Sequence, residues 1–206
     1  IELLKHIPGE TSSIQNNVIR RITEDEERNI WIGNDLGVSK YDRKTNRFVN
    51  YNLLEKYGGS ADSYFRAINI FFDSNNKLWI TTDNAGLFIY DPAKDSFKYA
   101  DNLLNGTRTP MINSFVLGIT EDSSGIVWIG DADYGLLFYD SKDSVFVPAT
   151  FNKQESAVDF TRIENQITSL YTDPSDIIWI AARNGVYKFN PGQNKLKSLV
   201  EYNYLK

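Results

Sequence analysis

Short runs of apolar and β-branched residues alternate with polar turns along almost the whole chain. Within one stretch of the sequence, four such runs occupy residues 115–120, 126–129, 136–139 and 145–147. Asp, Ser and Gly separate them, and runs of this length between turn residues predict antiparallel strands. No segment keeps an apolar period of 3.6 residues for three turns, so helix is expected to be nearly absent.

This pattern occurs four times, and each copy is centred on a tryptophan. Trp31, Trp79, Trp128 and Trp179 lie 48, 49 and 51 residues apart. An aspartate stands six residues before each of them, at Asp25, Asp73, Asp122 and Asp173. A glycine follows each tryptophan after six or seven residues, and an aromatic residue follows after ten or eleven. Four short strands in a repeat of this length predict a β-propeller blade.

Each landmark has a structural interpretation. The aspartate is expected to open the turn between the first two strands and to accept backbone N–H bonds there. The residue three positions later is Arg28, Asn76, Gly125 or Asp176, which fits a left-handed position. The tryptophan is expected to pack between sheets, and the following glycine to adopt a positive φ or to allow a close approach.

The sequence therefore predicts an all-β protein made of four four-stranded antiparallel blades. We expect the blades at about 13–60, 61–110, 111–160 and 161–206, within a single propeller segment 1–206. Residues 1–7 are expected to form an outer strand of a preceding blade. A fragment of a larger ring of about seven blades fits this arrangement, although a closed four-bladed propeller stays open as an alternative. Open blade faces would favour pairing of chains into a homodimer.

Composition excludes several classes of function. The net charge is −5, and acidic and basic residues are interspersed, which argues against a nucleic-acid surface. The absence of cysteine excludes disulfides and thiolate metal sites. No apolar run approaches the roughly 18 residues of a membrane helix, so no membrane contact is expected within this segment. Both ends of the chain are expected to continue into a longer protein.

A catalytic role finds little support in the sequence. His6 is the only histidine, and no nucleophile motif, metal-ligand cluster or phosphate-binding glycine loop occurs. The repeated aspartates are too regular for a catalytic acid–base pair. We therefore expect no enzyme activity in this chain, no metal and no cofactor.

Binding is better supported, because propeller loops vary while the scaffold repeats. The long connections 53–66, 101–113 and 151–165 and the turns within blades are expected to share one rim. Exposed aromatic rings and planar polar groups on such a rim would suit a ligand, and arginine would pair with a carboxylate or sulfate group. Ordinary solvated loop side chains are the alternative for each residue. The candidates for a ligand site are Tyr64, Arg66, Arg108, Asp133, Tyr134, Arg162 and Arg183.

The repeated motif resembles the two-component-regulator propeller repeat. The first copy has Asn17, Ile19, Ile22 and Asp25, followed by Ile30-Trp-Ile-Gly33, Gly37-Val38 and Tyr41-Asp42. The third copy has Asp122-Ser-Ser-Gly-Ile-Val-Trp-Ile-Gly130. Thr81 and Ala181 depart from the glycine of the other two copies, and Asn190 and Leu196 replace the usual Asp and Phe in the fourth.

The resemblance implies the periplasmic sensor region of a hybrid two-component system of the Bacteroides type, with a histidine-kinase parent. Members of that family detect oligosaccharides and regulate the use of glycans, so the resemblance implies that the candidate ligand residues bind an oligosaccharide. A sugar ring would need a flat apolar partner and planar polar groups for its hydroxyls. The remaining blades of the parent propeller would then be partners of this chain. Two alternatives stay open: a protein-interaction scaffold, and a streptogramin-lyase-like enzyme, which would need a catalytic histidine and a metal site on its rim.

Overall fold

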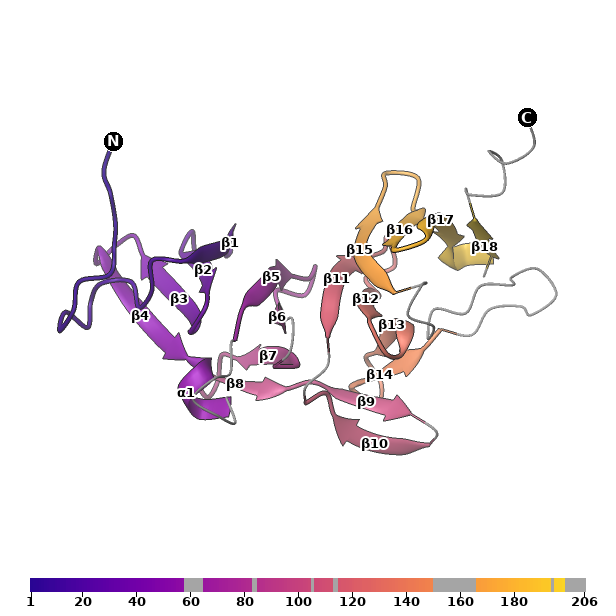
Figure 1. Ribbon diagram of the computed structural model, residues 1–206, viewed down its shortest axis with the longest axis horizontal. Helices are drawn as coiled ribbons and strands as arrows, with labels where there is room; N and C mark the ends of the chain where they lie inside the picture. Colours follow the sequence, from indigo (N-terminus) through magenta and orange to yellow (C-terminus); the bar gives the residue numbers. More distant parts are fainter. Residues whose placement is uncertain are drawn as a thin grey trace. The chain divides into compact units, whose positions relative to one another are not determined.

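The computed structural model describes residues 1–57, 65–82, 85–104, 106–112, 115–149, 166–193 and 195–198. Strands dominate these residues and form four sheets (Figure 1). The chain divides into two compact units, Ile1–Tyr99 and Ala100–Lys206, which are described separately below. Within the ranges that the structure describes, no helix has the length and apolar character required to cross a bilayer. The predicted all-β fold of propeller blades is confirmed.

The first unit contains two antiparallel blades of four strands each. The first blade comprises β1 (Ile19–Glu24), β2 (Ile30–Asn34), β3 (Gly37–Asp42) and β4 (Arg47–Asn52). A short helix, α1 (Leu53–Tyr57), follows it. The second blade comprises β5 (Ala67–Phe72), β6 (Leu78–Thr82), β7 (Leu87–Asp91) and β8 (Ser96–Tyr99). Each strand pairs with the next along the chain, as short turns between apolar runs predict.

The second unit contains a six-stranded and a four-stranded sheet. The third blade comprises β11 (Val116–Glu121), β12 (Val127–Asp131), β13 (Gly135–Asp140) and β14 (Val145–Pro148). The fourth comprises β15 (Ile167–Thr172), β16 (Ile178–Ala182), β17 (Gly185–Asn190) and β18 (Lys195–Ser198), with a short 3₁₀ turn, η2 (Pro191–Gln193), before β18. The first strand of each blade carries a register shift near its start, so the four blades share one irregularity.

A hairpin enlarges the third sheet beyond the expected four strands. The segment 101–113 was expected to be a loop, but it contains β9 (Asp101–Leu104) and β10 (Thr107–Pro110), which pair with each other. β9 also contacts the outer strand β14 in parallel, opposite Phe146. Gly106, at φ 75, supplies the turn between β9 and β10. Residues 101–110 thus belong to the third sheet, and the expected division at 110/111 moves to the junction of Tyr99 and Ala100.

Each unit has a core between its two blades. In the first unit, Trp31 and Val38 of the first blade pack with Ile70, Ile80 and Phe88 of the second. In the second unit, Trp128 and Leu136 pack in the same way with Ile167, Leu170 and Ile180 of the fourth blade. The first strand of the later blade, β5 or β15, lies against the first two strands of the earlier one. Blade-on-blade packing explains why both faces of the inner strands are apolar.

The expected outer strand at residues 1–7 does not form. A strand exists through its ladder of backbone hydrogen bonds, and residues 1–7 have no strand assignment in the structure. Two backbone N–H groups here donate to side chains instead, His6 to Asn17 Oδ1 at 2.7 Å and Ile7 to Ser13 Oγ at 3.0 Å. The following residues reach β4, where Phe48 N–H donates to the Ser12 carbonyl at 3.1 Å.

Candidate functional site

The aspartate and the tryptophan of each repeat form one hydrogen-bonded turn. The indole N–H donates to the second carboxylate oxygen of the aspartate six residues earlier, at 2.8 to 2.9 Å in all four blades. The first carboxylate oxygen accepts the N–H of the residue four positions after the aspartate, at 2.8 to 3.1 Å. One carboxylate thus ties the first turn of a blade to the tryptophan in its core.

The backbone of this turn has the predicted conformation. The third residue after the aspartate has a φ of 70, 60, 79 or 61° in the four blades, at Arg28, Asn76, Gly125 and Asp176. The glycine that opens the third strand of each blade also has a positive φ, from 75° at Gly135 to 151° at Gly185. Both expectations are confirmed, and both follow from turn chemistry that can be recognised within a few residues.

Hydrogen bonds keep two of these aspartates ionised. Burial raises the pKa of Asp25, but the Asn29 side chain, the Trp31 indole and the charge of Lys40 outweigh it, so the net pKa is lowered. The Trp31 indole lies under the Lys40 ammonium, 5.2 Å from the ring centroid. The pKa of Asp173 is lowered first by the Trp179 indole and then by the Ile177 N–H. The carboxylates of Asp25 and Asp173 are therefore held by hydrogen bonds within their own turns, and their role is structural.

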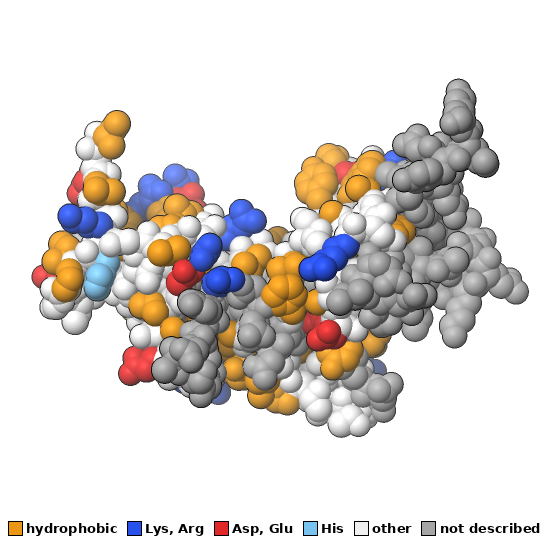
Figure 2. Space-filling view, in the orientation of Figure 1, with side chains coloured by type: hydrophobic (Ala, Val, Ile, Leu, Met, Phe, Trp, Pro, Cys, Tyr) orange, Lys and Arg blue, Asp and Glu red, His pale blue; other side chains and the backbone are white. Residues whose placement is uncertain are grey.

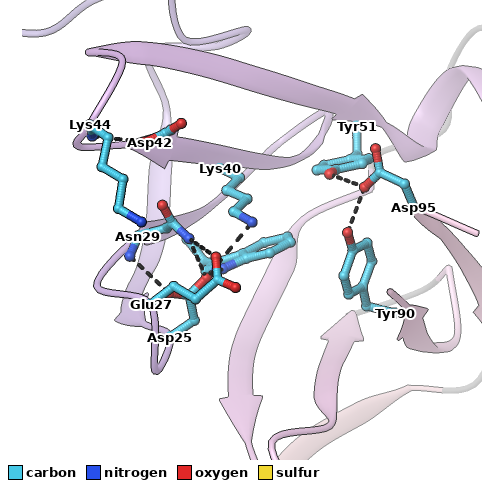
Figure 3. A network of polar contacts seen from close by, with 10 residues as sticks. Asp25, Glu27, Asn29, Lys40, Asp42, Lys44, Tyr51, Tyr90 and Asp95 are labelled. Atoms are coloured by element: carbon cyan, nitrogen blue, oxygen red, sulfur yellow. Dashed lines mark hydrogen bonds and ion pairs between the residues drawn. The ribbon is translucent and has the colours of Figure 1, made fainter. Parts of the chain in front are cut away.

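A second polar cluster joins the two blades of the first unit (Figure 3). Tyr51 on β4 and Tyr90 on β7 both donate to Asp95 Oδ1, each at 2.5 Å. The Tyr51 ring also stacks on Trp31, with centroids 5.9 Å apart and planes 10° from parallel. Burial and then the Asp95 bond raise the Tyr51 pKa, and the same causes raise the pKa of Tyr90 to about 12. The phenols lower the pKa of Asp95 in return.

Two of the predicted ligand residues lie in one turn of the third blade. The N–H groups of Asp133 and Tyr134 donate to Asp131 Oδ1 at 2.8 and 3.0 Å, and Asp131 itself is fully buried. The Tyr134 side chain is 43% exposed. Arg183 lies in the corresponding turn of the fourth blade, where its N–H donates to the Gln166 carbonyl at 3.1 Å. These turns occupy equivalent ends of the two blades in this unit.

Arg108 lies elsewhere in the same unit. On β10, its side chain forms an ion pair with Asp101 at 2.8 Å and donates to the carbonyls of Asp143 and Ser144 at 3.2 and 3.4 Å. Those two residues lie in the turn after β13, whereas Tyr134 immediately precedes β13. The expectation that both share a rim is therefore not met, because the hairpin carries Arg108 to the other end of the blade.

The remaining candidates belong to other segments. Arg66 is half-buried and directly precedes β5, at the end of the second blade that corresponds to Gln166 in the fourth. Tyr64 and Arg162 lie outside the described residues. The sequence reasoning missed Asp35, in the turn between β2 and β3, which accepts two bonds from Arg20 at 2.6 and 3.0 Å. Asp35 lies two residues before Gly37, as Asp133 lies two residues before Gly135. This spacing would have identified the Asp35 turn as the counterpart of the Tyr134 turn.

The single histidine is bonded within the N-terminal segment. His6 Nδ1 is 2.9 Å from the Ile14 carbonyl. On the face in Figure 2, acidic and basic side chains are interspersed with apolar ones. Within the part of the chain that the structure describes, no three His, Cys, Asp or Glu residues are grouped to hold a metal ion.

Known proteins share the repeat and the fold. The model of the two-component regulator propeller matches residues 13–35. A histidine kinase of Formosa agariphila is 26% identical over 171 residues, covering 82% of this chain and 12% of that protein. The chain thus spans only a small part of this relative.

Solved structures agree with the fold. The extracellular domain of a putative hybrid two-component system from B. thetaiotaomicron has a TM-score of 0.65 at 20% identity, covering 96% of this chain and 24% of that one. A streptogramin B lyase has a TM-score of 0.59 at 14% identity, covering 92% of this chain and 55% of that one. Both likenesses concern the fold. The resemblance seen in the sequence is confirmed: residues 13–35 match the two-component regulator propeller, and the chain folds into propeller blades.

Proposed function

We propose that this chain is a non-catalytic segment of the sensor region of a hybrid two-component signalling protein, exposed to the periplasm. The repeat match at residues 13–35 supports this role most directly. The similarity to a histidine kinase and the shared fold with an extracellular domain of a hybrid system point in the same direction. The parent would be the kinase, and this segment would contribute to recognition outside the cytoplasm.

We further propose that the parent senses an oligosaccharide and regulates its use, with the Tyr134 turn as a contact. Tyr134 combines an exposed aromatic ring with a backbone held by two hydrogen bonds to buried Asp131. An aromatic ring on a rigid turn loses little conformational entropy when it binds a ligand, which favours affinity. The neighbouring Asp133 carboxylate would accept bonds from sugar hydroxyls, and Arg183 would pair with an acidic substituent.

Isothermal titration of the chain with neutral, uronate-containing and sulfated oligosaccharides tests this proposal. We expect one class to bind and Tyr134→Ala to weaken binding about fivefold or more, because the loss of a stacking ring costs over about 1 kcal/mol. Tyr171→Ala is the matched control, since Tyr171 is 61% exposed but lies on β15 and not in a turn. Equal loss in both variants, or no binding to any class, would contradict a glycan site at this turn.

The two alternative functions require different structural features. A protein-interaction scaffold gains support from the exposed apolar side chains of Ile19 and Ile22 on β1. A lyase-type enzyme would need its histidine on the rim, whereas His6 is bonded within the N-terminal segment. Similarity to the streptogramin lyase at 14% identity concerns the fold and carries no assignment of activity.

A further inference from the structure

The last strand of each four-stranded blade forms its outer edge, where backbone groups can bind a strand of another chain. Two of these strands carry lysine, which opposes such pairing: exposed Lys98 lies on β8, and two lysines lie on β18. The other two strands lack lysine and are rich in aromatic and β-branched residues: Phe48, Val49 and Tyr51 on β4, and residues 145–147 on β14. These two edges therefore favour association between chains most strongly.

The N-terminal segment covers the edge of β4. The Phe48 N–H donates to the Ser12 carbonyl at 3.1 Å and therefore points away from β3. Asn50 Nδ2 donates to the Ser13 and Thr11 carbonyls at 2.8 and 3.3 Å. This segment thus lies on the side of β4 to which a strand of another chain would have to bind.

The β9–β10 hairpin covers the edge of β14 (Figure 1). β9 pairs with β14 in parallel, with Asn102 opposite Phe146, and both residues are at most 3% exposed. Thr109 Oγ1 on β10 donates to Asn102 Oδ1 at 2.8 Å, which connects the two strands of the hairpin beside this contact. The Arg108 guanidinium bonds Asp101 within the hairpin and two carbonyls in the turn between β13 and β14. The hairpin is therefore fixed along the side of β14 that a strand of another chain would use.

The hairpin makes β10 the new edge of the sheet, and this edge is poorly suited to a further strand. The Met111 N–H donates to the Ala100 carbonyl at 2.8 Å, on the side of β9. Because backbone groups of successive residues point to opposite sides of a strand, the nitrogen of Pro110 faces outward, where proline has no N–H to donate. The Pro110 carbonyl already accepts the Ile112 N–H at 2.9 Å. The sheet thus ends at β10.

We propose that the β9–β10 hairpin is an edge guard, a segment that prevents β14 from pairing with β14 of a second copy of this chain. It replaces the apolar edge 145–147 by one that carries Arg108 and ends in Pro110. A second copy is the partner that is excluded, because two identical strands can pair antiparallel about a two-fold axis, with the same surface on both chains. The proposal does not depend on glycan sensing, so either can fail alone.

Two substitutions at exposed positions weaken the hairpin without altering the core of the blade. Arg108→Ala removes the ion pair with Asp101 and both bonds to the turn between β13 and β14. Gly106→Val places a β-branched residue at a φ of 75°, which strains the backbone although an added Cβ meets no atom within 4 Å. In sedimentation velocity at rising concentration, we expect each variant to associate at least about tenfold more tightly than the original chain.

A charge placed on β14 identifies the surface that associates. Val147→Lys in the Arg108→Ala chain should abolish the association, because a lysine on an edge strand opposes pairing. Ser141→Lys in the same chain is the matched control. It adds the same charge in the exposed turn before β14, outside the strand, and should leave the association intact. Circular dichroism of each variant ensures that only folded chains are compared.

Three results would overturn the proposal. Association of Arg108→Ala and Gly106→Val no stronger than that of the original chain would show that the hairpin does not protect an edge. Equal loss of association with Val147→Lys and Ser141→Lys would show a general effect of charge. Association that persists with Val147→Lys but disappears with Ile22→Asp would place the contact on the exposed apolar side chains of β1.

Discussion

At the scale of single residues, the repeated aspartate connects the first turn of each blade to its tryptophan. Asp73 is 9% exposed and accepts the N–H groups of Asn75 and Lys77 and the indole of Trp79. Charge-assisted bonds of this kind are stronger than neutral ones. Their main effect on stability is that removal of the acceptor leaves buried donors without partners. The repetition of Asp and Trp at a spacing of six therefore reflects one hydrogen bond that recurs four times.

Asp73→Ala is expected to destabilise the first unit by about 3 kcal/mol or more. Each buried donor that is left without an acceptor costs about 1–3 kcal/mol. Asp91→Ala should cost less than about 1 kcal/mol, because Asp91 lies in an exposed turn where it accepts the Ala93 N–H and pairs with Lys94 at 3.6 Å. Urea unfolding followed by tryptophan fluorescence measures both. Similar losses in the two variants would contradict the special role of the Asp–Trp bond.

Asp95 provides a test by pH. Its folded-state pKa is lowered below the ordinary 3.8 by the two phenols. A lowered pKa contributes stability that is complete above 3.8 and is lost as the pH falls through the folded-state value. Asp95→Asn keeps an acceptor and tolerates the left-handed φ of 45°. The stability difference between the original chain and Asp95→Asn should therefore shrink as the pH falls from ~7 to ~2. A constant difference in urea titrations across this range would count against the cluster.

At the scale of elements, each unit is defined by how closely one blade approaches the next. A Cβ at Gly33 would meet Ala67 Cβ and Ile70 Cδ1 at 3.0 Å, whereas one at Gly130 would overlap Ile167 at 2.2 Å. The departures Thr81 and Ala181 occur in the second and fourth blades, the later blade of each unit. The glycine of the motif is thus present in the first and third blades, against which the later blade of the same unit packs.

Gly130→Ala is expected to cost about 1–3 kcal/mol through overpacking, and Gly33→Ala less, because the Ile70 side-chain end can move. Thermal unfolding of both variants measures the difference. In an Ile167→Ala background, the cost of Gly130→Ala should fall, since the overlapping Cγ2 is gone. An unchanged cost in that background would mean that Ile167 Cγ2 does not set the limit.

Most of each blade could be predicted because its signals are local. The turn aspartates, the left-handed residues and the strand runs are recognised within about ten residues. The hairpin β9–β10 was missed because its alternation is weak and its partner β14 lies some 40 residues away in the sequence. The same limit applies to the site: Asp133 and Tyr134 share a turn, but nothing local shows that Arg108 lies at the other end of the blade.

At the scale of the whole molecule, charge is the property that acts over the longest range. The net charge of −5 and the pI of about 5.0 give the chain an acidic character at neutral pH. Nucleic-acid affinity depends on cations that displace counterions from phosphate. An acidic surface with interspersed basic groups lacks this driving force.

We expect no binding of duplex DNA by the chain at about 150 mM salt, the range in which basic proteins still bind. Fluorescence anisotropy of labelled DNA measures this, with the same titration at low salt as a comparison. A complex whose affinity falls steeply with rising salt would contradict the prediction and would indicate a basic surface that the summed charge conceals.

The sequence by itself determined the blade: its four strands, its turn chemistry and the tryptophan on which it is centred, because these depend on residues close together in the chain. Only the tertiary structure decided which distant groups meet, such as the side chains of Tyr51 and Asp95 and the backbones of Ser12 and Phe48. It also decided that Ile19 and Ile22 on β1 stay exposed. These outcomes depend on how sheets stack, and a repeat pattern specifies each sheet without specifying its neighbour.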